Sequence, residues 1–211
     1  MLENKTVKEF ISELASNSPA PGGGSVSAVS ASLSAALVSM VCNLTIGKKA
    51  YENLKDDEKK LIDDSLEYCS KVKDDFLDLM NEDTSVFLEL MKAFKMPKET
   101  EEEKCARSKE IQKGYKASLE VPLKTAKKAF ELYEYILNVA KYGNKNAISD
   151  AGVAALMAQS ALEAAILNVK INLSSIKDEE YVKNIEKEIS TLVRDGLENK
   201  NEILKIVNEK I

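Results

Sequence analysis

A single aspartate within an apolar helix face is the residue best placed to carry out acid–base chemistry. The chain contains no histidine, which excludes a Ser-His-Asp triad, a Cys-His nucleophile pair and a histidine metal site. Asp83 lies between Met80 and Phe87 in a 4/3 apolar repeat, where a carboxylate is costly to bury unless it is paired. Burial would raise its pKa and suit it to donate or accept a proton. The alternative is a structural aspartate paired with a lysine, an arginine or an amide.

A second candidate is the glycine turn, Ser18-Pro19-Ala20-Pro21-Gly22-Gly23-Gly24-Ser25, which leads directly into a run without charged residues. The first N–H groups of a helix that starts in this way have no internal acceptor, so they can bind an anionic or carbonyl group. The turn lacks the Gly-Lys-Ser/Thr ending of a P-loop. The residues alone leave two readings open, a ligand site and a tight turn that lets two helices pack closely.

Four further polar residues have side chains that could hydrogen-bond or pair with a ligand. Arg107 is one of only two arginines among thirty basic residues, and the arginine side chain suits bidentate hydrogen bonds to a carboxylate or phosphate. Asp150 is predicted to cap a helix, with a role in the site as the alternative. Asn168 and Asn172 share one helix face at i, i+4 spacing. They either bind a heterocycle or bond to neighbouring helices.

Helices must position all of these residues. Apolar periodicity predicts helices over residues 6–15, 26–46, 56–95, 100–140, 151–173 and 178–211. No segment has the alternating pattern of a β-strand over a convincing length. Thr6 with Glu9 and Thr100 with Glu103 form capping boxes. Pro122 is expected to kink or split its helix, and the last helix is expected to be interrupted near Gly196.

The predicted fold is all-α, a single-domain helical bundle over residues 1–211. Two small-residue helices, 26–46 and 151–173, carry almost no charge and are expected to lie against one another, buried among long amphipathic helices. The first of them should be enclosed on nearly every side.

Charge, cysteine content and hydropathy argue against nucleic-acid-binding, disulfide-rich secreted and membrane-spanning classes of protein. The net charge of −5 argues against nucleic-acid binding. Cys42, Cys69 and Cys105 are widely spaced and are interpreted as reduced core residues of a cytoplasmic protein. The chain does not begin with a signal-peptide pattern. The run 26–46 is long enough to span a bilayer, but its many serines and alanines favour a buried helix over a membrane span.

The chain resembles the cyclodeaminase/cyclohydrolase family, which includes the C-terminal domain of formimidoyltransferase-cyclodeaminase and stand-alone methenyltetrahydrofolate cyclohydrolases. The resemblance covers almost the whole chain. Its marks, in order, are the glycine turn, Asn43-Leu44-Thr45-Ile46-Gly47-Lys48-Lys49, Asn81-Glu82-Asp83-Thr84 with Phe87, Pro97-Lys98 with Thr100, Arg107, Pro122, Gly143-Asn144 with Ser149-Asp150, and Asn168-Val169 with Asn172.

This resemblance implies a helical domain that forms homodimers and a substrate that is a tetrahydrofolate carrying one carbon, with no cofactor or metal beyond it. It implies Asp83 as the acid/base and as the charge partner of an amidinium. The glycine turn (Ser18, Pro21, Gly22, Gly23, Gly24, Ser25) would hold the pterin or the p-aminobenzoyl-glutamate end. The further substrate-binding residues are Lys48, Lys49 and Arg107, for the glutamate carboxylates, with Asn144, Asp150 and Asn168.

Where the family carries Asp-Glu-Asp, this chain has Asn81-Glu82-Asp83. The two family activities, cyclodeamination and cyclohydrolysis, act on the same carbon, and the sequence does not separate them. A non-catalytic folate-binding or interaction protein on the same scaffold is the alternative function.

Overall fold

The computed structural model describes all 211 residues and contains helices but no strand. The elements, in chain order, are η1 (Leu2–Asn4), α1 (Val7–Leu14), α2 (Gly23–Thr45), α3 (Lys49–Glu52), α4 (Asp56–Phe94), α5 (Glu101–Tyr142), η2 (Lys145–Ala147), α6 (Ile148–Leu173) and α7 (Glu179–Lys210). The prediction of an all-α fold is therefore confirmed.

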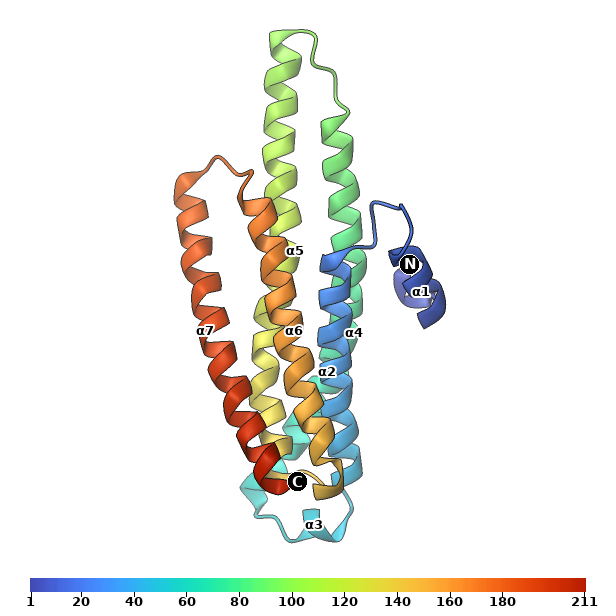
Figure 1. Cartoon of the computed structure of the whole chain (residues 1–211), viewed down its shortest axis with the longest axis vertical. Helices are drawn as coiled ribbons and strands as arrows, with labels where there is room; N and C mark the ends of the chain where they lie inside the picture. Colours follow the sequence, from blue (N-terminus) through green and yellow to red (C-terminus); the bar gives the residue numbers. More distant parts are fainter.

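Four long helices, α2, α4, α5 and α6, surround one apolar core (Figure 1). α2 and α6 are neighbours in one layer, α4 and α5 form the layer behind them, and α7 packs against α6 and α5. The α4–α5 pair extends past the start of α2 as a two-helix hairpin, while α1 lies at the side of the bundle, with Phe10 packed against the core. The glycine turn thus lies near the base of this hairpin.

Small side chains let α2 approach its neighbours closely, as the sequence predicts for the two small-residue helices. Alanines from both α2 and α6 are completely buried between them. Serine hydroxyls on α2 donate to backbone carbonyls of the adjacent helices. These bonds are Ser30 to Met157 O (2.9 Å) and Ser34 to Ala154 O (2.8 Å) on α6, and Ser32 to Lys73 O (2.8 Å) on α4.

α5 continues through Pro122 as one helix, so of the two expected outcomes, a kink or a split, the split is wrong. Proline lacks the N–H that would bond to the carbonyl four residues earlier, here that of Ser118. The Nδ2 of Asn172 on α6 donates to this carbonyl at 3.1 Å. The acceptor freed by proline is therefore satisfied from a neighbouring helix.

Two other local expectations are also wrong. α7 is continuous at Gly196, which is buried against α6, where a Cβ would overlap the side chain of Leu162. α6 begins at Ile148, so Asp150 lies in its first turn and does not cap it. The close approach of α6 at Gly196 is a contact between helices, which local sequence rules do not include.

The two predicted capping boxes and the predicted turn after α2 agree with the structure. Capping boxes form at Thr6–Glu9 and Thr100–Glu103. Gly47 follows α2 with φ of 72°, a backbone conformation that favours glycine. Cys42 and Cys69 are buried as predicted, and burial raises the pKa of the Cys42 thiol to about 12. Cys105 is exposed, so its assignment to the core is wrong.

α2 is less enclosed than its uncharged sequence predicts. One face of it, with Val26, Leu33, Met40 and Leu44, is 38–51% exposed, so the prediction of enclosure on nearly every side is wrong. By length and composition alone, α2 and the segment Lys145–Leu173 are each apolar enough to cross a membrane. More than half of the most apolar window of each is nevertheless buried inside the bundle.

Candidate functional site

The start of α2 is an open helix N-terminus. Gly22 occupies the N-cap position and supplies no side chain to bond the first amides. The first N–H to find an acceptor inside the helix is that of Val26, which donates to Gly22 O at 3.0 Å. Gly23 is exposed, so a ligand can approach the backbone here.

Asp83 of α4 lies directly against this helix start. Its carboxylate occupies the space that a Cβ on Gly24 would need. The hydroxyl of Ser25 donates to Asp83 Oδ2 at 3.1 Å and lies 3.3 Å from the hydroxyl of Thr84. The structure therefore brings together the two candidates that the sequence placed 58 residues apart.

Two opposing effects act on the pKa of Asp83. Burial raises the pKa because it penalises the charged carboxylate, whereas hydrogen bonds from the hydroxyl and the backbone N–H of Ser25 lower it. Burial is the larger effect, so the pKa of Asp83 is raised above its ordinary value. The carboxyl group therefore keeps its proton to a higher pH than an exposed aspartate does.

Asn168 of α6 forms the third side of the site. A Cβ on Gly23 would lie 3.2 Å from Asn168 Nδ2, so the amide borders the glycine turn. Asn168 Nδ2 donates to Ala164 O at 2.8 Å. The site thus combines the carboxyl group of Asp83, the hydroxyls of Ser25 and Thr84, the side-chain amide of Asn168 and the free backbone N–H groups at the start of α2.

Four predicted binding residues lie at the other end of the bundle. Lys48 and Lys49 follow the end of α2, while Asn144 and Asp150 flank the start of α6. Asn144 is tied to this end because its N–H donates to Thr45 Oγ1 at 2.9 Å. Within one copy, these residues do not join Asp83.

The remaining predicted residues occupy separate places. Arg107, on the hairpin, donates from Nη2 to the carbonyl of Phe94 at 3.1 Å and so links α5 to α4. The hydroxyl of Ser18 donates to Ala20 O at 2.5 Å within the turn. Pro21 is buried and follows a cis peptide bond.

Sequence reasoning missed Thr84 as a site residue, although it follows Asp83 directly. Its contact with the hydroxyl of Ser25 becomes visible only when α2 is placed against α4. The hydrogen bond from Asn172 to Ser118 settles one open alternative, since this side chain bonds to a neighbouring helix.

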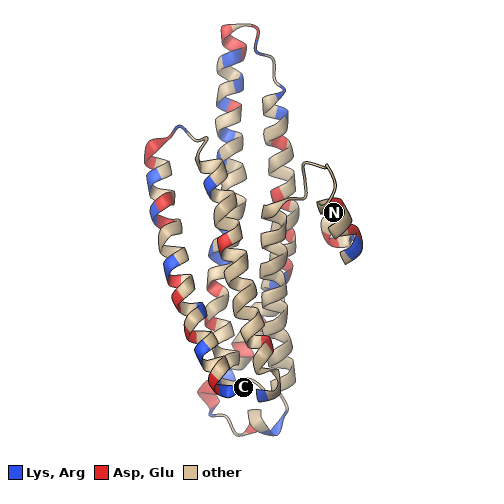
Figure 2. Cartoon of the chain, viewed as in Figure 1, with Lys and Arg blue, Asp and Glu red and all other residues tan.

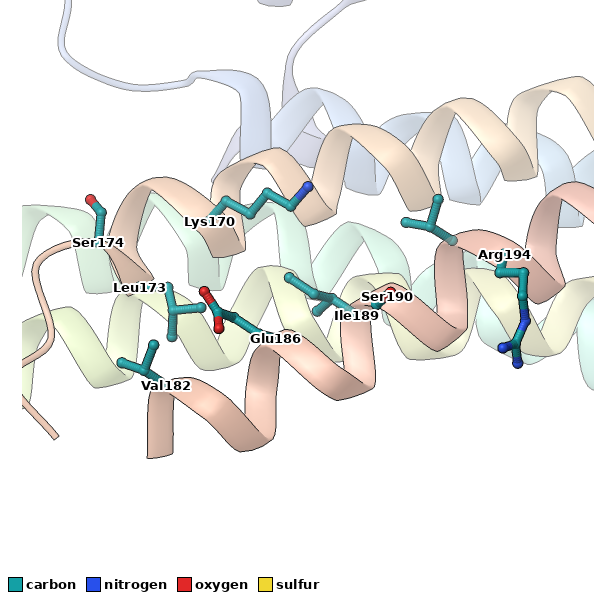
Figure 3. A pocket seen from close by; sticks show the side chains of 9 residues that line it. Lys170, Leu173, Ser174, Val182, Glu186, Ile189, Ser190 and Arg194 are labelled. Atoms are coloured by element: carbon teal, nitrogen blue, oxygen red, sulfur yellow. The ribbon is translucent and has the colours of Figure 1, made fainter. Parts of the chain in front are cut away.

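None of the five main surface hollows is lined by Asp83, Gly23 or Asn168. The most prominent, of about 660 Å³, lies between α6 and α7 over Leu173, Val182 and Ile189 (Figure 3). Lys170 and Glu186 border it, and no predicted site residue lines it. The Asp83 group of one copy therefore lies outside its five main hollows.

The model of the formiminotransferase-cyclodeaminase family matches residues 6–191, which include every element of this site. The chain belongs to this family. The resemblance inferred from the glycine turn and the later motifs is thereby confirmed.

Relatives of two kinds are similar to the chain. A methenyltetrahydrofolate cyclohydrolase of Methylorubrum extorquens is 38% identical over the full length of both chains. The formimidoyltransferase-cyclodeaminase of Sus scrofa is 33% identical over 92% of this chain, which corresponds to 35% of that longer protein. The crystal structure of a formiminotetrahydrofolate cyclodeaminase from Thermotoga maritima superposes with a TM-score of 0.80 at 27% identity, covering 100% of this chain and 97% of that one.

Proposed function

We propose that this protein is a folate-dependent one-carbon enzyme. It would convert formiminotetrahydrofolate to 5,10-methenyltetrahydrofolate and ammonia, hydrolyse 5,10-methenyltetrahydrofolate to 10-formyltetrahydrofolate, or do both. The observation that carries the proposal is the half-buried Asp83, with its raised pKa, against the open N-terminus of α2. The full-length similarity to a cyclohydrolase and to a cyclodeaminase structure supports the same substrate class.

Asp83 would move the proton that each reaction needs. In cyclodeamination, N10 of the folate attacks the formimino carbon, and protonation of the formimino nitrogen lets ammonia leave. In cyclohydrolysis, water adds to the bridging amidinium carbon, loses a proton, and the bond from that carbon to N5 opens. A carboxyl group with a raised pKa can donate the first proton and accept the second, without histidine.

The ionised form of Asp83 would also stabilise positive charge on the amidinium carbon, because opposite charges attract strongly in a partly desolvated site. The free amides at Gly23 and Gly24, with the side-chain amide of Asn168, suit the carbonyl and ring nitrogen atoms of a pterin. We expect a homodimer in the cytoplasm, with no cofactor beyond the folate and no membrane or nucleic-acid partner.

Two absorbance assays test the proposal. Purified protein is mixed with formiminotetrahydrofolate, and we expect the methenyltetrahydrofolate band to appear together with free ammonia if the protein is a cyclodeaminase. With methenyltetrahydrofolate as substrate, we expect faster loss of the band than in buffer if it is a cyclohydrolase. No change in either assay would refute catalysis, and titration calorimetry with both folates would then test the non-catalytic binding alternative.

A further inference from the structure

The buried hydroxyl of Ser25 has three possible hydrogen-bond partners on α4. It lies 3.1 Å from Asp83 Oδ2, 3.3 Å from Thr84 Oγ1 and 3.5 Å from the carbonyl oxygen of Met80. Ser25 is completely buried, whereas Asp83 and Thr84 are half-buried. A buried hydroxyl without partners costs free energy, so Ser25 needs hydrogen bonds in every protonation state of Asp83.

The ionised form of Asp83 sets one direction for these bonds. A carboxylate can only accept, so Ser25 must donate its single hydrogen to Asp83 Oδ2. The oxygen of Ser25 is then free to accept, and the hydroxyl of Thr84 is the donor within reach. The order of donation is therefore from Thr84 to Ser25 and from Ser25 to Asp83.

Protonation of Asp83 on Oδ2 reverses this order. The carboxylic acid then carries a hydrogen that it can donate to the oxygen of Ser25. The hydrogen of Ser25 can turn to Thr84 Oγ1 or to the carbonyl oxygen of Met80. Either hydroxyl of the Ser25–Thr84 pair can be the donor, so Ser25 keeps its hydrogen bonds in both states.

The hydroxyl of Thr84 is available for this chain because it is not bonded to its own helix. Threonine hydroxyls in helices often donate to the carbonyl four residues earlier, as those of Thr45 and Thr125 do in this protein. Thr84 makes no such bond to Met80, and its one side-chain hydrogen bond is with Ser25. Its hydroxyl can therefore rotate to donate or to accept.

No charged side chain competes with the two hydroxyls at Asp83. α2 contains no charged residue, as Figure 2 shows along its whole length. The charged groups on the other elements around the site are Glu3 of η1, Glu82 of α4, Glu120 and Lys124 of α5, and Glu163 and Lys170 of α6. None of them shifts the pKa of Asp83, which responds to burial and to the hydrogen bonds from Ser25.

We propose that Thr84 and Ser25 form a reversible hydrogen-bond chain that supports Asp83 both as an ionised base and as a protonated acid. Each hydroxyl keeps its own hydrogen and changes only the atom to which it donates. Thr84 is then a positioning residue, since it acts through Ser25 and touches no reacting atom. The chain is independent of any substrate, whereas its contribution to catalysis rests on the proposed function.

Titration of the Asp83 carboxyl carbon by NMR tests the chain without any activity measurement. In protein labelled at aspartate, Asp83→Asn identifies the signal by its loss. Thr84 favours the ionised form, because Ser25 then has no other donor, whereas the protonated form can use Met80 instead. We therefore expect Thr84→Val to raise the pH of half-titration, by less than Ser25→Ala, which removes the direct bond. Thr84→Ser keeps the hydroxyl and should titrate like the wild type.

Thr125→Val is the matched control for this titration. It makes the same replacement at a buried position of α5, where the hydroxyl bonds to the carbonyl of Val121 at 3.1 Å. It should leave the titration of Asp83 unchanged. Thr84→Ala should behave like Thr84→Val, and it takes the place of that variant if valine disturbs the packing. Half-titration of Thr84→Val and Thr84→Ala at the wild-type pH, or an equal displacement in Thr84→Ser, would overturn the chain.

Steady-state kinetics test the contribution of the chain to catalysis. We expect Thr84→Val to lower kcat by about 3- to 10-fold with little change in KM, because the chain acts on Asp83 and not on substrate binding. The inflection in the pH profile of kcat/KM should move upward, and Thr84→Ser should restore both properties.

The two measurements separate the chain from the proposed function. Wild-type kinetics in Thr84→Val, together with a displaced NMR titration, would refute the catalytic contribution and support the chain itself. An inactive wild-type protein would refute the proposed function, while the NMR titration would still decide whether the chain exists.

Discussion

At the scale of single residues, the protonation of Asp83 is decided by a competition between burial and hydrogen bonding. Ser25 donates to the carboxylate from its hydroxyl, and the N-terminus of α2 adds favourable partial positive charge. Burial at the junction of α2 and α4 nevertheless outweighs both, and the pKa rises. The site thereby holds a carboxyl group that can act as an acid as well as a base.

Asp83→Asn removes the proton transfer but keeps the shape of the side chain and an acceptor for the hydroxyl of Ser25. We expect turnover to fall by about 100- to 10,000-fold, the usual contribution of a general acid–base group. Steady-state rates with both folate substrates measure this loss. Turnover close to that of the wild type in a folded Asp83→Asn protein would contradict the assignment.

The same variant should be more stable than the wild type at neutral pH. Because folding raises the pKa of Asp83, its contribution to stability is fully present below the unfolded-state pKa and is lost as the pH rises through the folded-state pKa. Asparagine does not titrate, so the stability advantage of Asp83→Asn should grow across this pH window and disappear at lower pH. Urea unfolding of both proteins at several pH values measures it. An advantage that is constant with pH would show that titration is not the cause.

Ser25→Ala should shift the pH dependence of catalysis upward. The hydrogen bonds from Ser25 lower the pKa of Asp83, so loss of the hydroxyl lets burial raise that pKa further. We expect the Asp83-dependent inflection in the profile of kcat/KM to move to higher pH. An unchanged or lower inflection would mean that another group controls the profile.

At the scale of helices, the sequence predicted the elements well and their irregularities poorly. Capping boxes and apolar periods are local signals, and they located the starts of α1 and α5 and the course of α4. The continuity of α5 at Pro122 depends on Asn172, fifty residues away along the chain, whose amide replaces the lost bond. No local rule at Pro122 could have predicted that bond.

Gly24→Ala tests how closely α2 must approach α4. The added Cβ would overlap the carboxylate of Asp83, so either the side chain or the helix must move. We expect the free energy of unfolding to fall by about 1–3 kcal/mol and turnover to fall by about 100-fold, because small displacements of reacting groups are costly.

Gly22→Ala is the matched stability control for this substitution. Nothing lies within 4 Å of a Cβ at that position, so its unfolding free energy should stay within about 0.5 kcal/mol of the wild type. Equal destabilisation by Gly22→Ala and Gly24→Ala in chemical denaturation would contradict the role of the Gly24–Asp83 contact.

At the scale of the whole molecule, most candidate residues fall into two groups at opposite ends of one bundle, and Arg107 lies apart on the α4–α5 hairpin. The sequence predicted that Asp83 and the glycine turn belong to one site, and the two do lie in contact. Both could be recognised because a carboxylate and free amides are distinctive in an apolar setting. The sequence could not show that Lys48 and Asp150 lie at the far end. The order of motifs along the chain does not show at which end of the bundle each motif lies, because the chain reverses direction at each antiparallel helix.

Association of copies should make thermal stability depend on protein concentration. If unfolding is coupled to dissociation of a dimer, tenfold dilution should lower the Tm by about 1–3 °C. Differential scanning calorimetry over a hundredfold concentration range measures this. Leu33→Glu, which places a charge on the exposed apolar face of α2, should abolish the dependence. A wild-type Tm that is independent of concentration would indicate that a folded monomer suffices.

The serine hydroxyls of α2 also restrict how this helix can slide. Ser30 and Ser34 each bond to a particular carbonyl on α6, and Ser32 to one on α4. A shift of α2 along its axis by even one residue's rise, about 1.5 Å, would misalign all three bonds at once. The distance between the helix start and Asp83 is therefore fixed by bonds about two to three turns further along α2, and these serines hold the start of α2 in register with Asp83.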